Sequence, residues 1–344
     1  MYLGYFLICL LVISLLVMPT YRSILKKSIA LVLSHKRLLI IGFALAILGN
    51  GGEYDIFVHT VQNISPASIH FSSFLHFFTT NLITAHLVSA AKNLLLAHNP
   101  LANFGLIIAL SGIVYFAVTA QGAIIAAIYN AVRKKHKIAM RKNWSAAREK
   151  FWELLTANIF FKGGGILLAL IISAPFFMFL SSIPGIDEGY RLFLVGIFIF
   201  TPLAIISSFL VKYTLIFIIA KDKKPITAFI ESVKLFKENW LITLENSLLL
   251  FLLNALLGYA TLVLAFLLSF PLASALAIAA YPRVLDSGNY ATIIAWMSIL
   301  LILIFGSFLA VFQYATWTIL FTKLMARRKF ESKLIRITAH IFGK

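Results

Sequence analysis

The stretch Thr201–Trp240, TPLAIISSFLVKYTLIFIIAKDKKPITAFIESVKLFKENW, shows the pattern on which the whole chain is built. Its first part carries one charge, Lys212, and at about 1.5 Å per residue it can cross a hydrocarbon core of about 30 Å. The basic segment Lys221–Lys237 follows directly, and a further apolar segment begins after it. Apolar, basic and apolar segments in this order are typical of a chain that crosses a membrane repeatedly.

The composition is that of a membrane protein. Of the 344 residues, 61% are hydrophobic and 12% are charged, and the mean hydropathy is +0.96, which excludes a soluble globular domain. The net charge of +18 does not indicate a nucleic-acid partner, because the basic residues lie in short segments between apolar ones. Anionic membrane lipids are the expected partners. The single cysteine, Cys9, excludes an intrachain disulfide.

Seven apolar segments are expected to cross the membrane as helices. They are Tyr2–Met18, Leu38–Leu48, Leu101–Asn130, Ile159–Ile183, Leu192–Ala220, Ser247–Phe270 and Ala291–Leu320. The second is too short for a span unless the preceding helix joins it. The region Leu241–Tyr281 is too long for one span, and Pro271 is expected to break its helix and leave the following residues at the outer surface. A hairpin there would reverse the topology of everything downstream.

Charge gives the orientation. Of the 30 Lys and Arg residues, 25 fall on one side of the predicted membrane, in four segments: 22–37, 133–150, 221–237 and 323–344. An excess of this size marks the cytoplasmic side. The N-terminus is therefore predicted outside and the C-terminus in the cytoplasm. The predicted fold is an all-α integral membrane protein with about seven transmembrane helices and three amphipathic interfacial helices on the cytoplasmic side.

A threefold regularity divides the single polytopic domain, 1–344. The predicted parts are an N-terminal span and three similar helical units, the last with a basic tail: 1–20, 21–135, 136–222 and 223–344. Each unit begins with an amphipathic helix that leads into a span. The clearest apolar stripe is Ile226, Phe229, Ile230, Val233, Phe236 and Trp240, with Glu231, Lys234, Lys237 and Glu238 off it. The middle stripe is Trp144, Ala147, Phe151, Leu154 and Leu155, and the first is Leu25, Ile29 and Val32.

These amphipathic helices have two interpretations. As topology anchors they supply only the positive flanks that a multi-pass protein needs. Alternatively, they form a lipid-engaging collar, with apolar side chains at the acyl boundary and basic side chains at anionic head groups. The candidate head-group contacts are Lys26, Lys27, Arg148, Lys150, Lys234 and Lys237.

Polar side chains recur inside the return spans at a similar depth. Gln121, Lys212 and Gln313 lie 12, 9 and 10 residues before the next basic segment, which places each near the middle of the membrane. An ionisable group at this depth costs about 2.5 to 3.5 kcal/mol on translocon scales and is expected to face protein or water. Lys212 is therefore a candidate for binding a carboxylate, a phosphate or an anionic head group, with Gln121, Gln313 and Asn254 beside it. In the alternative interpretation these side chains only join neighbouring helices.

Metal, cofactor and enzyme signatures are missing from the sequence. Five of the eight histidines fall between Gly51 and Pro100, but none of these pairs has the separation of three or four residues that puts two ligands side by side on one helical face. The triplet Gly163, Gly164 and Gly165 lacks the residues of a phosphate loop and is expected to ease close helix packing. The sequence therefore predicts no metal, no cofactor and no catalytic residue.

The layout of the chain resembles a family. A basic amphipathic helix enters a span, and a return helix such as Thr119–Ile125 precedes a basic loop. This arrangement, from Tyr21 onward, is similar to that of uncharacterised bacterial multi-pass proteins related to the membrane domain found beside glycerophosphodiester phosphodiesterases. The resemblance implies a prokaryotic inner-membrane protein near lipid metabolism. It implies no phosphodiesterase activity, because that domain has no counterpart here.

Three functions stay open from the sequence. The first is a non-enzymatic membrane protein that associates with lipid or acts as an assembly scaffold. The second is a transporter of an anionic or amphipathic small molecule with a site around Lys212. The third is an intramembrane enzyme of lipid metabolism.

Overall fold

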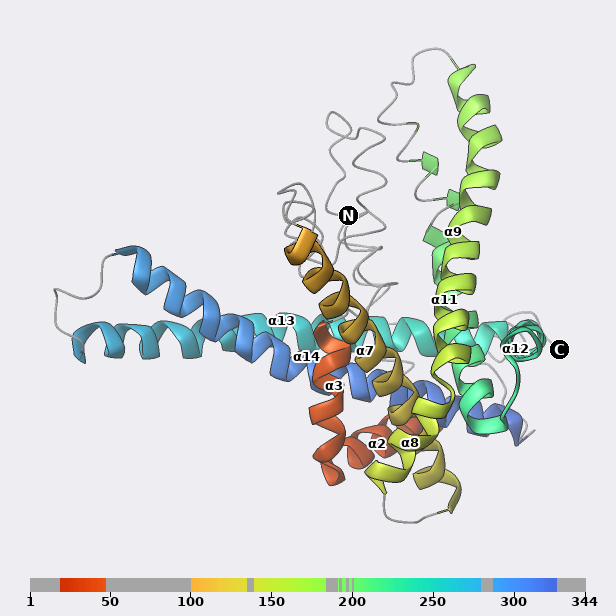
Figure 1. The fold of residues 1–344 in the computed structure, drawn as a ribbon. Helices are drawn as coiled ribbons and strands as arrows, with labels where there is room; N and C mark the ends of the chain where they lie inside the picture. The colour runs from red at the N-terminus through yellow and green to blue at the C-terminus, as the bar shows by residue number, and fades with distance from the viewer. Residues whose placement is uncertain are drawn as a thin grey trace. The chain divides into compact units, whose positions relative to one another are not determined.

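The computed structural model describes residues 19–47, 100–134, 139–183, 191, 194–195, 198–199, 201–279 and 287–326. Within these residues every regular element is a helix (Figure 1). The helices are α2 (Pro19–Ser34), α3 (Arg37–Ile47), α7 (Pro100–Lys134), α8 (Met140–Glu149), α9 (Phe151–Ser181), α11 (Thr201–Lys221), α12 (Pro225–Glu238), α13 (Trp240–Ala279) and α14 (Ser287–Met325). The predicted all-α class is confirmed. The predicted first span, Tyr2–Met18, and most of the basic tail lie outside the described residues.

Five of these helices contain a segment that is long and apolar enough to cross a membrane. The segments are Ile107–Arg133, Phe151–Ser181, Pro202–Lys221, Trp240–Thr261 and Leu303–Met325. They overlap the third to seventh predicted spans. A sixth candidate is the pair Tyr21–Ser34 and Arg37–Ala46, which is bent by 106° at its break. The helices fit a multi-pass membrane protein, and the number seven stays a prediction.

Proline does not end the long helix α13. The helix continues through Pro271 to Ala279, so the predicted break at this proline is wrong. Helix α9 likewise contains Pro175 in its interior. A proline removes one backbone hydrogen bond, but in an apolar environment the remaining backbone groups can be satisfied only inside the helix, which keeps the helix intact.

Short helices precede the spans, as the sequence predicts, but one of them ends earlier than expected. Helix α8 stops at Glu149, Lys150 has a non-helical backbone (φ −99°, ψ 14°), and α9 begins at Phe151. The predicted stripe from Trp144 to Leu155 therefore crosses a break and does not belong to one helix. Helix α12 ends in the same manner, with Asn239 at φ −133° and ψ 28°.

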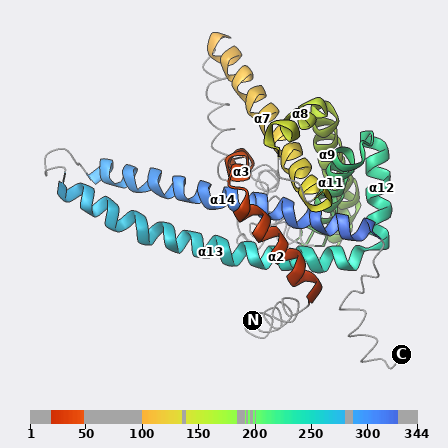
Figure 2. The same cartoon turned by 90° about the horizontal axis from the view of Figure 1, so that it is seen from below.

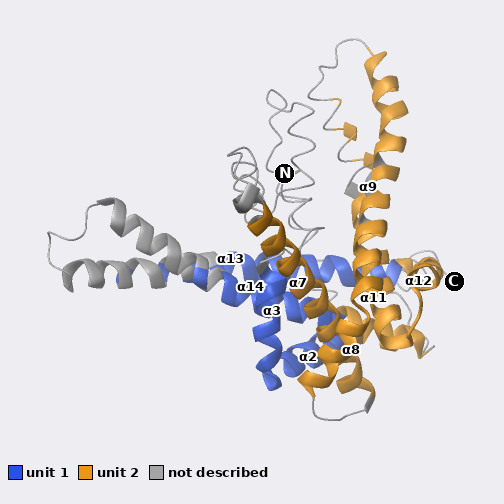
Figure 3. Ribbon diagram, in the orientation of Figure 1, with its two compact units in different colours: residues 1–47, 241–316, 327–344 blue, residues 48–240, 317–326 orange. Residues whose placement is uncertain are grey.

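The chain divides into two compact units (Figure 3). Unit 1 consists of residues 1–47, 241–316 and 327–344, and unit 2 consists of residues 48–240 and 317–326. Both α13 and α14 continue from one unit into the other. These boundaries differ from those of the three predicted helical units, which stay a prediction.

In unit 1, small residues bring α3 and α14 together. A Cβ added at Gly42 would lie 2.7 Å from the Ser307 carbonyl oxygen, and one at Gly306 would lie 3.3 Å from Ala46 Cβ. Ser307 Oγ also donates a hydrogen bond to the Leu39 carbonyl. Small residues and interhelical hydrogen bonds are the usual basis of helix packing in membranes, where lipid is as apolar as leucine.

Unit 2 contains α7, α8, α9, α11 and α12, which gather together in Figure 2. Gly122 of α7 allows a close approach to α8 and α9, because a Cβ there would lie 3.0 Å from Ala147 Cβ and 2.6 Å from Leu154 Cδ1. The C-terminal part of α14, which also belongs to unit 2, packs on α11 through aromatic rings. The ring pairs are Phe209–Trp317 (5.3 Å between centroids), Tyr213–Trp317 (5.6 Å) and Phe217–Phe321 (4.8 Å).

Candidate functional site

Helix α12 packs on its own unit through small residues. It begins after Lys224 with Pro225 in its first turn, where the missing N–H costs no helical hydrogen bond. Its buried residues are Ala228, Ser232 and Leu235. Ser232 Oγ donates to the Ala228 carbonyl (2.6 Å) and accepts a hydrogen bond from Thr214 Oγ1 of α11 (3.0 Å). The small buried face lets α12 lie directly against α11.

The apolar stripe predicted on α12 is divided between protein and surroundings. Phe229 stacks on Phe161 of α9, with 4.0 Å between ring centroids and 4° between ring planes. By contrast, Ile226 is 73% exposed, Ile230 is 63% exposed, and Trp240, directly after the helix, is 54% exposed. The prediction of one common apolar face is thus wrong in part, because the smaller residues make the main contact with unit 2.

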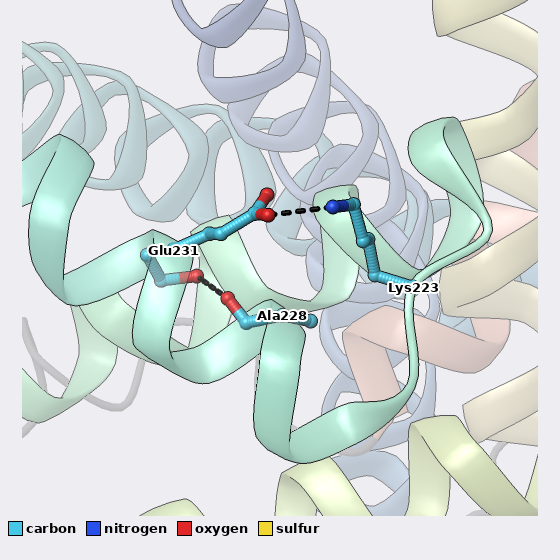
Figure 4. A network of polar contacts seen from close by, with 4 residues as sticks. Lys223, Ala228 and Glu231 are labelled. Atoms are coloured by element: carbon cyan, nitrogen blue, oxygen red, sulfur yellow. Dashed lines mark hydrogen bonds and ion pairs between the residues drawn. The ribbon is translucent and has the colours of Figure 1, made fainter.

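Two ion pairs include residues of the turn before α12. Lys223 Nζ lies 2.6 Å from Glu231 Oε1 (Figure 4). Lys150 pairs with Asp222, which has a left-handed backbone (φ 55°). Among the described residues Lys234 and Lys237 are exposed and form no ion pair. The six predicted head-group contacts therefore differ in their surroundings, because Lys150 already has an acidic partner.

Helix α8 presents a different surface. Its buried residues are Asn143 and Ala147, and Asn143 Oδ1 accepts a hydrogen bond from Asn130 Nδ2 of α7 (3.0 Å). Trp144 packs on Phe116 of α7, with 5.2 Å between ring centroids. Arg148 is exposed. None of the ten residues of α8 is an exposed large hydrophobic residue.

Helix α2 buries one face and exposes a mixed basic and apolar one. Tyr21, Ile24, Leu25, Ser28 and Val32 are buried. The other face exposes Arg22, Lys26, Lys27, Ile29 and Leu33. The predicted stripe is thus divided, because Leu25 and Val32 are buried whereas Ile29 is exposed. The predicted head-group contacts Lys26 and Lys27 lie on the exposed side.

One side-chain hydrogen bond joins each of the short helices α2, α8 and α12 to a long apolar helix. Thr214 bonds Ser232 between α11 and α12, and Asn130 bonds Asn143 between α7 and α8. In unit 1 Thr316 Oγ1 of α14 donates to Ser28 Oγ of α2 (3.1 Å). Each contact joins two small polar side chains, and the threefold regularity of the sequence stays a prediction.

The four predicted mid-membrane residues belong to both units. In unit 2, Lys212 is 6% exposed and its Nζ lies 5.1 Å from the centroid of the Trp317 ring, a cation–π contact. Gln121 Oε1 accepts a hydrogen bond from Asn158 Nδ2 of α9 (2.9 Å). Gln313 and Asn254 lie in unit 1, where Gln313 is buried and Asn254 is half-buried. A common site for all four stays a prediction.

The sequence analysis did not predict the residues that contact two buried charged groups, Lys212 and Glu245. One is Trp317, which covers the Lys212 ammonium. The other is Tyr21, whose hydroxyl donates a 2.5 Å hydrogen bond to Glu245 Oε2 in unit 1. Glu245 is only 4% exposed, so it does not balance cations at the surface as an interfacial glutamate would. The sequence does indicate that such partners exist, because a charged residue within an apolar run requires a polar or aromatic neighbour. It does not indicate which residue the partner is.

Comparisons with known proteins give no relative. No family model matches the chain, and no curated protein or solved structure matches it either. Within the described residues no three His, Cys, Asp or Glu side chains come together in a group that could hold a metal ion. The five clustered histidines lie outside those residues.

Proposed function

We propose that this protein is a non-enzymatic, multi-pass protein of a prokaryotic inner membrane that binds anionic lipids through its interfacial helices. One observation carries the proposal: Ile226, Ile230 and Trp240 are exposed beside the exposed lysines of α12. Tryptophan is enriched at membrane interfaces, and apolar and basic groups side by side are typical of a helix that lies in the interface. The basic segments would then face the cytoplasm.

Free energies favour this interpretation over a surface in water. Each large aliphatic side chain transferred from water to an apolar environment contributes about 1.5 to 3 kcal/mol. Each basic residue near an anionic membrane surface contributes about 1 kcal/mol more. A helix that only marks topology needs the charges but not the exposed isoleucines.

Transport is the alternative function. Its support is the burial of a cation, Lys212, within a helix that fits a membrane span. The contact with Trp317 gives this cation a stabilising neighbour, which a structural lysine would also need. Assembly scaffolding and intramembrane lipid chemistry stay further possibilities, as does the layout-level resemblance to the phosphodiesterase-associated membrane domain.

The test is a lipid titration followed by native mass spectrometry. The purified full-length protein is titrated with phosphatidylglycerol or with phosphatidylcholine, and bound lipids are counted. We expect the parent to retain phosphatidylglycerol preferentially and Lys234→Gln/Lys237→Gln to retain less. Lys92→Gln/Arg283→Gln is the matched control, since it removes the same charge from the predicted outer side. Equal retention by all three proteins would contradict lipid binding at the cytoplasmic side.

A further inference from the structure

Helices α8 and α12 of unit 2 expose different kinds of side chain. Helix α12 exposes two isoleucines, whereas α8 turns its tryptophan onto Phe116 and exposes only small and polar residues. Helix α8 has three basic residues and one acidic residue, whereas α12 has two of each. A collar of equivalent helices, as the sequence suggests, would not show this difference.

Four exposed residues form one edge of α12. Ile226, Ile230, Lys234 and Lys237 follow one another at intervals of four, four and three residues, which keeps them on one side of a helix. Lys237 thus lies in line with the isoleucines, although the sequence pattern placed it off the apolar stripe. The first half of this edge is aliphatic and the second half is cationic.

The charges along this edge are not cancelled within the described residues. Glu231 forms an ion pair with Lys223, and Asp222 forms an ion pair with Lys150. The remaining acid of the helix, Glu238, is exposed in its last turn. Lys234 and Lys237 are therefore exposed and unpaired among the described residues. A ligand that fits this edge has an anionic group for the lysines and an apolar part for the isoleucines.

We propose, on the basis of the lipid-binding function above, that this edge of α12 is a binding site for a single anionic phospholipid. An acyl chain contacts Ile226 and Ile230, and the head-group phosphate lies between Lys234 and Lys237. Trp240 marks the depth of the head groups at the end of the helix. Helix α8 attracts anionic lipids only through long-range charge, which salt screens.

The experiment compares three double variants at low and high salt. Ile226→Asn/Ile230→Asn removes the aliphatic half, Lys234→Gln/Lys237→Gln removes the cationic half, and Arg141→Gln/Lys142→Gln removes two exposed cations from α8. All six positions are partly or fully exposed, so the fold should persist, and unchanged near-UV circular dichroism checks this. Phosphatidylglycerol binding is measured by native mass spectrometry at both salt concentrations.

We expect both α12 variants to lose affinity in high salt and the α8 variant to bind like the parent. At low salt, loss of two lysines is expected to weaken binding about thirtyfold, if each contributes about 1 kcal/mol, and high salt should reduce this factor by screening the charges. Loss of the isoleucines should weaken it by about tenfold or more. Brominated phosphatidylglycerol should quench tryptophan fluorescence in the parent, and Trp240→Phe should reduce that quenching because Trp240 is one of the exposed tryptophans.

Three results would overturn the site. If Ile226→Asn/Ile230→Asn binds like the parent while Arg141→Gln/Lys142→Gln does not, the α12 site is wrong but the lipid-binding function stands. If every variant binds like the parent, the function fails as well. Capture of a protein rather than a phospholipid by the isoleucine edge would also overturn the assignment.

Discussion

Gly165 gives a sharp test of the packing of unit 2. It is the last of three consecutive glycines in α9, and a Cβ added there would lie 2.3 Å from Ser207 Oγ and 2.9 Å from Ser207 Cβ. Rotation of the serine hydroxyl relieves the first contact but not the second, because the backbone fixes the position of Cβ. Cβ atoms added at Gly163 and Gly164 meet nothing within 4 Å. Gly165→Ala is therefore expected to separate α9 from α11.

The expected loss of stability is the difference between the free energies of unfolding of Gly165→Ala and Gly164→Ala. Overpacking by a methyl group costs about 1 to 3 kcal/mol, whereas alanine stabilises a helix by about 1 kcal/mol relative to glycine. The gain from the helix preference of alanine is the same at Gly163, Gly164 and Gly165. The free energy of unfolding of Gly165→Ala should thus fall about 1 to 3 kcal/mol below that of Gly164→Ala.

Unfolding in mixed micelles of SDS and a mild detergent, followed by tryptophan fluorescence, measures this difference. Gly163→Ala serves as a second control and should behave like Gly164→Ala. In the Gly165→Ala background, Ser207→Gly should restore stability because it removes both atoms that clash. If Gly165→Ala and Gly164→Ala unfold at the same SDS fraction, the close approach of α9 to α11 at this glycine is wrong.

Three further predictions concern buried polar groups. Ser232→Ala should lower the free energy of unfolding by about 1 kcal/mol in the same assay, since one buried hydrogen bond to α11 is lost. A double-mutant cycle of Lys212→Met and Trp317→Phe should give a coupling of about 0.5 to 2 kcal/mol, and zero coupling would argue against the cation–π contact. Tyr21→Phe should cost about 1 to 3 kcal/mol because Glu245 loses a buried donor, and a smaller loss in a background of Glu245→Gln would identify the bond as the cause.

Hydropathy and charge predicted the elements of this fold well. Five of the predicted spans overlap helices with a membrane-crossing segment, and the amphipathic stretch before α13 is a separate helix. These features depend on the local chain, because a helix must satisfy its own backbone in lipid. The predicted stop at Pro271 failed for the same reason, since breaking the helix would expose more backbone groups than one proline removes.

The faces of the helices could not be predicted from the sequence. In water the largest apolar residues mark the buried face, but next to lipid they gain nothing by turning inward. On α12 the buried residues are Ala228, Ser232 and Leu235, while Ile226 and Ile230 are exposed. Similarly, one glycine of the triplet in α9 is packed, and only the three-dimensional contact with Ser207 distinguishes it from its neighbours.

The hydrogen bond between Thr316 and Ser28 spans 288 residues of sequence. At about 5 to 20 residues per second, a ribosome that has just completed Ser28 needs about 15 to 60 s to reach Thr316. During that time the face of α2 that carries Ser28 is not yet packed on α14, and we expect the insertion machinery to cover it. A cysteine at position 28 in chains stalled before α14 should accordingly react with a thiol reagent and become protected once α14 is made.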